Sequence, residues 1–283
     1  MKIGIFDSGI GGITVLHEAY HRLPNENYIF YADVDHVPYG MKKPEEIIRY
    51  ADNIVSELYE KGVDAVLIAC NTATSVAAEH LRAKYSIPII GMEPAVKPAV
   101  EAAVNAEGRV LVMATPVTIR ENKLRKLLEQ VDRSHIVDLL PMPRFVLFAE
   151  NGVFDGEEVD AYIEERLAEY NKESFSEIVL GCTHFNYFKP AIKKAFSGLS
   201  EEYILPNLID GNLGTIRHLA DVLGLKVVSD EDDEPLGKNG IGDRFNEIDN
   251  RTTYLMSGRA IGVDEYQKIK HLHERLELVR NID

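Results

Sequence analysis

The sequence of 283 residues contains no tryptophan and only two cysteines, Cys70 and Cys182. It also lacks a long hydrophobic run, because no stretch approaches the roughly 18 to 20 apolar residues of a membrane span. The apolar run near Met1 is too short for a signal-peptide core. We therefore expect a cytoplasmic protein with no membrane partner, in which both cysteines are free thiols because cytosolic disulfides are rare.

Positive charge is scarce. The sequence has 31 Lys and Arg residues against 46 Asp and Glu residues, which gives a formal net charge of −15. A nucleic-acid partner is not expected, since that class of protein uses a surface of Lys and Arg to neutralise phosphates. The same charge repels an acidic small molecule at long range. A site for an acidic substrate would therefore use local dipoles and hydrogen bonds.

Short β-branched runs alternate with amphipathic stretches along most of the chain. The expected strands are Lys2 to Phe6, Tyr28 to Tyr31, Ala65 to Ala69, Ile87 to Ile90, Val110 to Met113, Ile136 to Leu139 and Ile178 to Leu180. Helical patterns lie between them, for example from Pro44 to Lys61 with Gly62 at its C-terminal end. Repeated strand and helix units predict an α/β fold with mainly parallel sheets flanked by helices.

The chain contains an internal echo. The segment Val66 to Thr72 resembles Ile178 to His184, and Cys182 lies 112 positions after Cys70. A second pair, Ile3 to Ser8 and Val110 to Thr115, has a similar offset of 107 positions. We therefore expect two similar α/β domains, each with a cysteine at the carboxyl end of a strand, and a ligand site in the cleft between them.

The domains are predicted to comprise residues 1–95 with 207–283 and residues 96–206. Within the first domain, Ser229 to Arg251 is rich in acidic residues and contains Gly237, Gly240 and Gly242, so a solvated loop is expected there. A last strand, Thr253 to Met256, and a helix from about Val263 to Val279 close the chain.

The paired cysteines suit one kind of chemistry. A free cysteine is most often a small buried hydrophobic residue, but both of these lie at a strand-to-helix junction, where the helix N-terminus lowers the pKa of a thiol. Inversion of an amino-acid α-carbon needs a base on one face and an acid on the other, and one thiolate with one thiol can exchange those roles. The sequence thus predicts an amino-acid racemase that uses Cys70 and Cys182.

Polar neighbours could assist the thiols. Asp7 follows a strand and His184 lies two residues after Cys182, although Asp7 is equally suited to cap a helix and a histidine there is often structural. The loop with Gly9, Gly11 and Gly12 matches no dinucleotide or P-loop pattern, but its N–H groups could hold a carboxylate. Neutral donors also follow the strands, namely Ser8, Asn71, Thr72, Thr115, Thr118 and Thr183.

Two other functions compete. The segment His17-Glu18-Ala19-Tyr20-His21 matches the H-E-x-x-H pattern of zinc peptidases. We expect these histidines on the flank of an ordinary helix that ends at Pro24, because no third-ligand motif is evident and only a distant carboxylate could complete a site. A noncatalytic ligand-binding protein would explain two domains but not the matched thiols.

Five segments in order resemble the glutamate racemase family over most of the chain from Lys2 to about Gly224. They are Asp7 to Leu16, Tyr31 to Asp33 with Val37 to Gly40, Ala69 to Thr74, Pro143 to Gly152 and Leu180 to His184. The sequence departs from the family pattern at Phe185 to Phe188 and at Asp210 to Asn212. Neither departure removes a proposed acid or base.

The resemblance implies a racemase that interconverts L- and D-glutamate for peptidoglycan synthesis, with aspartate as the nearest alternative substrate. It implies Cys70 and Cys182 as the acid and base, Asp7 assisting the first and His184 the second, with Glu150 and Asp33 as supporting acidic residues. The residues implied to line the substrate site are Asp7, Ser8, Pro38, Tyr39, Gly40, Asn71, Thr72, Thr115, Thr118, Thr183 and His184. It also implies a homodimer with no pyridoxal phosphate, other cofactor or metal. Because the chain begins at its first strand, we expect no activation by a peptidoglycan precursor.

Overall fold

The first sheet contains the first strand of the chain at its centre. A computed structural model describes residues 1–120, 122–200, 203–237, 241–280 and 282, and within them this sheet has the order β10-β9-β2-β1-β3-β4. Its strands are β1 (Lys2–Asp7), β2 (Asn27–Ala32), β3 (Ala65–Ile68), β4 (Ile89–Gly91), β9 (Thr252–Met256) and β10 (Arg259–Ala260). All neighbours pair in parallel except β9 and β10.

The second sheet has the order β6-β5-β7-β8, with every pair parallel. Its strands are β5 (Arg109–Ala114), β6 (Val137–Pro141), β7 (Phe175–Leu180) and β8 (Asn207–Asp210). The strands expected from the sequence are thus present, and the α/β fold with parallel sheets is confirmed. The sequence analysis missed β8, which follows Pro206 directly, and the two-residue β10.

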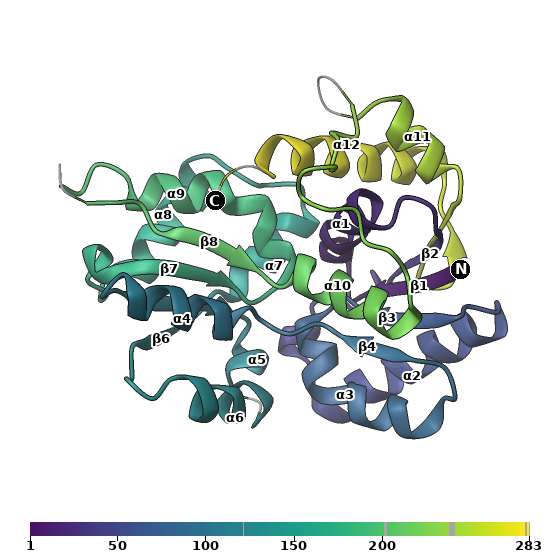
Figure 1. Cartoon of the computed structure of the whole chain (residues 1–283), viewed down its shortest axis with the longest axis horizontal. Coiled ribbons are helices and arrows are strands. Elements are labelled where there is room, and N and C mark those ends of the chain that lie inside the picture. Colours follow the sequence, from purple (N-terminus) through teal and green to yellow (C-terminus); the bar gives the residue numbers. More distant parts are fainter. Residues whose placement is uncertain (121, 201–202, 238–240, 281, 283) are drawn as a thin grey trace.

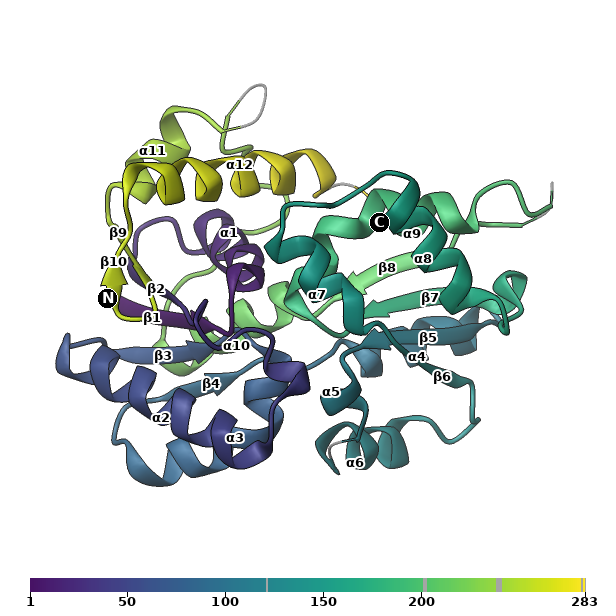
Figure 2. The same ribbon diagram turned by 180° about the vertical axis from the view of Figure 1, so that it is seen from behind.

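Helices cover both faces of each sheet (Figures 1 and 2). They are α1 (Ile13–Arg22), α2 (Pro44–Glu60), α3 (Asn71–Lys84), α4 (Val96–Asn105), α5 (Pro116–Arg120), α6 (Asn122–Val131), α7 (Pro143–Glu150), α8 (Glu157–Leu167), α9 (Lys189–Phe196), α10 (Asn212–Leu223), α11 (Asp243–Asp249) and α12 (Val263–Val279), with 3₁₀ turns η1 (Ile10–Gly12), η2 (Tyr39–Met41), η3 (Lys172–Ser174) and η4 (Thr183–Phe188). Side chains alternate between the faces: Ile5 of β1 packs in the core beneath α1, and its neighbour Phe6 packs in the core beneath α2 and α3.

Helix α2 shows how local sequence sets these boundaries. Pro44 occupies its first turn, where a missing N–H costs nothing, and the Glu46 side chain accepts a hydrogen bond from the Lys43 N–H. Ile47, with four other apolar residues of the helix, is buried. Gly62 follows the helix with φ of +71°, a left-handed conformation that glycine adopts without strain. The helix therefore lies within one residue of its predicted end.

The prediction that Ser229 to Arg251 forms a solvated loop was wrong for its second half. Residues Asp243–Asp249 form α11, and Phe245 and Ile248 are buried with Leu236. Asp249 accepts hydrogen bonds from the hydroxyl groups of Tyr20 and Tyr254, so even an acidic residue of this segment points inward. Residues 238–240, including Gly240, lie outside the described residues. The density of acidic residues hid the apolar positions that attach the segment to the core.

Replacement of Phe245 tests that attachment. We expect Phe245→Ala to lower the free energy of unfolding by about 3–5 kcal/mol, because the fully buried ring lies 4.8 Å from His273 and leaves a cavity when removed. The matched control is Glu231→Ala, an exposed position in the same segment, with an expected effect within about 0.5 kcal/mol. Urea denaturation measures both values. Equal stabilities of the two variants would restore the solvated-loop interpretation.

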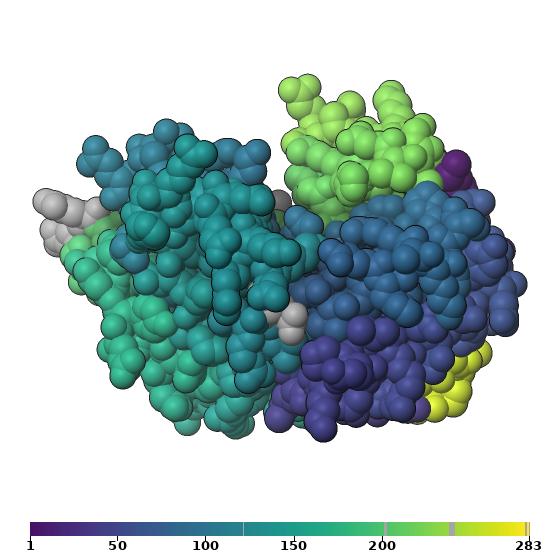
Figure 3. All heavy atoms as spheres, turned by 90° about the horizontal axis from the view of Figure 1, so that it is seen from below, coloured from purple at the N-terminus to yellow at the C-terminus, as the bar shows by residue number. Residues whose placement is uncertain are grey.

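The two sheets, each with its covering helices, meet along a seam. Figure 3 shows the part built around the second sheet, mostly in blue-green and teal, against the part built around the first, which contains purple, blue, yellow-green and yellow atoms. Direct bonds cross this seam, among them a contact of 3.1 Å between the Oγ1 atoms of Thr72 and Thr115. The carboxyl ends of the central strands of both sheets therefore face a shared region.

No helix among the described residues has the length and apolar character needed to cross a membrane.

Candidate active site

Cys70 lies just beyond the carboxyl end of β3 and caps the N-terminus of α3. Its Sγ accepts a hydrogen bond from the Ala73 N–H at 3.4 Å and lies 3.7 Å from the hydroxyl oxygen of Ser8, beyond the end of the neighbouring strand β1. The side chain is buried, and this burial raises the pKa of the Cys70 thiol, with the nearby carboxylate of Asp7 raising it further. The thiol is thus held in its protonated form.

Cys182 occupies the corresponding place in the second sheet, beyond β7 and before η4. Its Sγ lies 3.8 Å from Nδ1 of His184, and Nε2 of that ring lies 2.7 Å from Oε1 of Glu150 at the end of α7. Burial disfavours a charged ring, but the hydrogen bonds with Cys182 and Glu150 outweigh it, and the pKa of His184 is raised well above its usual value. Cys182 thus lies beside an imidazole ring, whereas Cys70 lies beside a hydroxyl group. The two thiols therefore differ in their surroundings.

Asp7 links the two halves of the site. Its Oδ2 accepts hydrogen bonds from the Gly12 N–H at 2.7 Å and from the hydroxyl of Thr183 at 3.4 Å, while its Oδ1 is buried without a hydrogen-bond partner. Burial raises the pKa of the Asp7 carboxyl, although the charge of His184 partly offsets this effect. The carboxyl thus retains one free acceptor oxygen inside the site.

The glycine loop binds carboxylates of the protein itself. The Ile10 N–H donates to Oε1 of Glu150 at 2.9 Å, and the Gly12 N–H donates to Asp7. These two N–H groups, which the sequence analysis offered to a ligand, are therefore already in use. A side chain on the loop would also collide with the site, since a Cβ atom at Gly11 would lie 2.3 Å from Nδ1 of His184.

The replacement Gly11→Ala tests this close approach. We expect it to lower kcat by about 10²-fold, because the added methyl group displaces His184 and a displacement near 1 Å is enough for such a loss. Gly214→Ala is the matched control, since a Cβ atom there meets nothing within 4 Å. Steady-state racemisation rates for both variants, with thermal melts to confirm folding, decide the point. Full activity of Gly11→Ala would show that the contact is unimportant.

Three threonine hydroxyl groups meet where the halves join. Thr72 of α3, Thr115 after β5 and Thr118 of α5 lie 3.0–3.2 Å from one another through their Oγ1 atoms, and all three are buried. Asn71 is also buried, and its Oδ1 has no hydrogen-bond partner. The structure thus gathers uncharged donors and acceptors from both sheets at one place.

The segment before α2 approaches the same region. The Tyr39 hydroxyl donates to Oδ2 of Asp33 at 2.6 Å, and a Cβ atom added at Gly40 would lie 3.0 Å from the side chain of Thr115. The Val37–Pro38 peptide bond is cis. Asp33 is therefore engaged with Tyr39 and also with His36, whose ring nitrogen lies 2.8 Å from it. No bond joins Asp33 to either cysteine among the described residues.

The sequence analysis missed the residues that hold this arrangement from behind. The Tyr187 hydroxyl donates to the Ile10 carbonyl at 3.1 Å, and Phe188 stacks on Phe145 at 4.3 Å. Both lie in the segment that departs from the family pattern, and Phe185 there is also fully buried. The sequence did contain one signal for them, because these aromatic residues cluster directly after the segment Leu180 to His184 that carries the second cysteine. The departure is thus a matter of packing around the site.

Residues 14–217 match the Asp/Glu/Hydantoin racemase family. The chain belongs to this family. It is 46% identical over 283 residues to a glutamate racemase of Lachnospira eligens, with 100% of both chains covered. The family membership agrees with two α/β sheets that each carry a cysteine at a strand end.

Solved racemase structures share the fold. Escherichia coli glutamate racemase in complex with L-glutamate and the activator UDP-MurNAc-ala is 25% identical and superposes with a TM-score of 0.72, covering 92% of this chain and 99% of that one. Francisella tularensis glutamate racemase in complex with D-glutamate is 25% identical with a TM-score of 0.71, covering 97% and 93%. The expected racemase fold is confirmed over nearly the whole length of this family member.

Proposed function

We propose that this family member is a cofactor-independent glutamate racemase that interconverts L- and D-glutamate through Cys70 and Cys182. The observation that carries the proposal is the pair of buried thiols beyond the ends of β3 and β7 in different surroundings, Cys70 beside the Ser8 hydroxyl and Cys182 beside the ring of His184. The relatives support the substrate, since two of the solved racemases are complexes with L-glutamate and with D-glutamate.

We propose the following roles for the two cysteines in one direction of the reaction. Cys182, as the thiolate beside protonated His184, removes the α-proton from one face of the substrate, while the Cys70 thiol gives a proton to the other face. After this turnover Cys70 is the thiolate and Cys182 the thiol, so the enzyme is ready for the opposite enantiomer. Glu150 orients His184 through the bond of 2.7 Å and keeps it charged, which makes it a positioning residue.

Substrate recognition uses the unpaired polar atoms. Asp7 Oδ1 and Asn71 Oδ1 are buried acceptors without partners, and an α-ammonium group would satisfy them. The hydroxyl groups of Thr72, Thr115 and Thr118, with those of Ser8 and Thr183, would donate to the carboxylates. Neutral donors suit an acidic substrate in a protein of net charge −15, since they bind it by short-range hydrogen bonds. Pro38, Tyr39 and Gly40 complete the wall beside Thr115.

The proposed site must open for substrate to enter. Its central side chains are almost fully buried, with 6% exposure for Cys70 and 8% for Cys182. We propose that the two domains separate to admit glutamate and close to exclude water. Because strand β8 pairs with β7, we propose that the second crossing between the domains lies after Asp210 and not between residues 206 and 207. The first crossing is still proposed between residues 95 and 96.

Circular dichroism of L-glutamate and D-glutamate solutions tests the proposed activity. We expect purified, metal-free protein to bring both solutions to zero ellipticity, and L- and D-aspartate to change far more slowly. Loss of signal with aspartate instead would move the assignment to an aspartate racemase. Tight binding of glutamate without any loss of signal, by folded protein, would favour the noncatalytic binding protein.

The biological setting follows from the proposed activity. D-Glutamate made in the cytoplasm would supply peptidoglycan synthesis, and we propose a homodimer as the working form. Analytical ultracentrifugation across a range of protein concentrations tests the dimer. A species of twice the chain mass of 31.8 kDa is expected, and a single species with the mass of one chain would contradict the dimer.

A further inference from the structure

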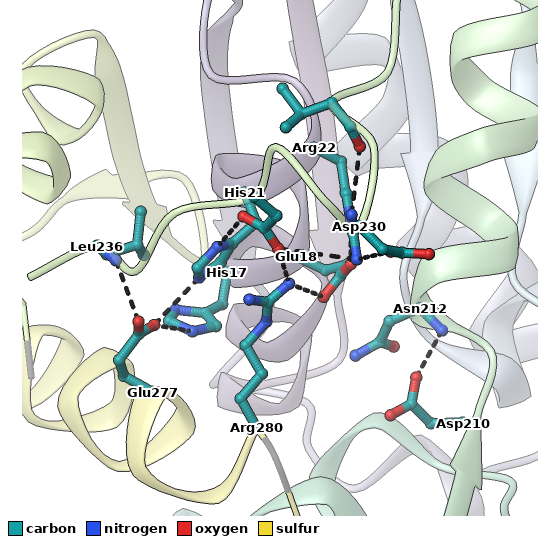
Figure 4. A network of polar contacts seen from close by, with 12 residues as sticks. His17, Glu18, His21, Arg22, Asp210, Asn212, Asp230, Leu236, Glu277 and Arg280 are labelled. Carbon is teal, nitrogen blue, oxygen red and sulfur yellow. Dashed lines mark hydrogen bonds and ion pairs between the residues drawn. The ribbon is translucent and has the colours of Figure 1, made fainter.

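A cluster of buried histidines lies away from the thiols, on the face of α1 that packs against α12 (Figure 4). His17 and His21 of the H-E-x-x-H segment present their Nε2 atoms to the same carboxylate oxygen, Glu277 Oε2, at 3.1 and 3.0 Å. The three possible ligand atoms lie within 4.8 Å of one another. Glu277 is the distant carboxylate that the sequence motif alone lacked.

The outer nitrogen of each ring is also held. Nδ1 of His21 lies 2.8 Å from Oδ1 of Asp233, and Nδ1 of His17 lies 2.9 Å from Nδ1 of His273. Glu277 accepts a hydrogen bond from the Leu236 N–H through its other oxygen. A carboxylate partner such as Asp233 fixes the tautomer and orientation of a histidine that binds a metal through Nε2. The cluster therefore has the supporting contacts as well as the three inner atoms.

Two ring nitrogens among these histidines lack a hydrogen-bond partner, Nε2 of His17 and Nε2 of His273, and the first lies beside Glu277. Nε2 of His17 is buried and makes no hydrogen bond of acceptable angle, although it lies close to Glu277. If Nδ1 of His17 donates to His273, a lone pair on Nε2 faces the carboxylate oxygen. Two lone pairs at that distance repel unless a cation lies between them.

We propose that His17, His21 and Glu277 bind a divalent transition-metal ion, with zinc the best fit, and that this ion joins α12 to α1. Two imidazole nitrogens and one carboxylate oxygen are a common zinc ligand set, with a water molecule as the fourth ligand. An adjoining cavity of about 390 Å³, lined by His17, Glu18 and Arg280 among others, has room for that water.

The site is structural rather than hydrolytic. Glu18, the residue that would act as base in a peptidase, bonds to Nε of Arg22 at 2.8 Å and lies 3.8 Å from Arg280. Its charge is thus already paired. The side chains of the ligands are at most 10% exposed, so the protein would enclose most of the ion. The ion is therefore expected to stabilise the fold without entering the racemase reaction.

A proton is the competing occupant. Nδ1 of His21 lies 2.8 Å from Asp233 and its Nε2 lies 3.0 Å from Glu277, so a proton on Nε2 would occupy the place of the metal ion. The affinity for metal should therefore fall as pH falls.

Metal titration of untagged, chelator-treated protein tests the proposal. We expect one Co²⁺ ion per chain with the visible absorption bands of four-coordinate cobalt, displaced by one equivalent of Zn²⁺. At a hundredfold excess over its dissociation constant, Zn²⁺ should raise the thermal midpoint by roughly 5–10 °C. His21→Gln and Glu277→Gln should lose the bands, and Asp233→Asn should bind about 10- to 100-fold more weakly.

The control is His271→Gln, which replaces an exposed histidine of the same helix whose Nδ1 lies 2.9 Å from Glu274. It should bind cobalt like the unchanged protein. Cobalt binding that is absent, or that persists unchanged in His21→Gln and Asp233→Asn, would overturn the metal site and leave a proton as the occupant. Racemisation by the chelator-treated protein is measured in parallel. Because the ion is outside the reaction, cobalt binding tests the metal site and racemisation tests the proposed activity, and either test can fail while the other succeeds.

Discussion

Cys70→Ala and Cys182→Ala should each lower the racemisation rate by about 10³-fold or more, while both proteins remain folded. Each replacement removes either the acid or the base of a concerted pair, and general acid–base catalysis contributes roughly 10² to 10⁴ per group. Each thiol is buried, so the smaller alanine side chain fits without collision. Circular dichroism of both glutamate enantiomers measures the rate, and thermal melts confirm the fold.

The single variants also separate the two roles. Each retains one thiol, so each should still exchange the α-proton of one enantiomer with solvent deuterium, and the two variants should prefer opposite enantiomers. A variant that keeps more than a tenth of the racemisation rate would contradict the assignment of that cysteine. Exchange of the same enantiomer by both variants would show that the thiols do not face opposite sides of the substrate.

Glu150→Gln should lower kcat by about 10²-fold and shift the alkaline limb of the pH profile to lower pH. Glu150 helps to raise the pKa of His184, so the ring stays charged below that raised value and loses its charge as pH rises through it. Without the carboxylate this loss occurs at lower pH. The activity that depends on a charged His184 beside Cys182 is therefore expected to fall at a lower pH in the variant.

The matched control for this profile is Glu158→Gln. Its carboxylate pairs with Arg144 on the surface, where the side chain is 64% exposed, and its removal should leave the pH profile unchanged. Rates measured from acid to alkaline pH with both variants decide the matter. An unshifted alkaline limb in Glu150→Gln would mean that His184 does not govern this ionisation.

The sequence contained the fold and the centre of the site in local patterns. Strand positions followed from β-branched runs, and the echo between the segments around Cys70 and Cys182 placed both thiols at strand ends. Contacts between distant segments could not be read in this way. Nothing near His17 indicates Glu277, which is 260 positions away, and nothing near Ile10 indicates that its N–H binds Glu150.

Local composition also misled in one segment. Acidic residues dominate Ser229 to Arg251, so the pattern indicated a solvent-exposed loop. In the structure, however, Leu236 and Phe245 are buried and Asp233 bonds to His21. A charged residue is buried when a partner compensates it, and that partner comes from another part of the chain. The short β8 was missed for a similar reason, because pairing with β7 rather than its own sequence makes it a strand.

The most direct test of the two-base account is deuterium incorporation during racemisation in D₂O, followed by proton NMR of the α-position from each enantiomer in turn. The proton that enters the product comes from the second thiol, which has exchanged with solvent. We therefore predict that the first product molecules carry deuterium while the remaining substrate keeps its α-proton, in both directions. Product that retains the α-proton of the substrate would mean that a single group removes and returns it, and would contradict the roles of Cys70 and Cys182.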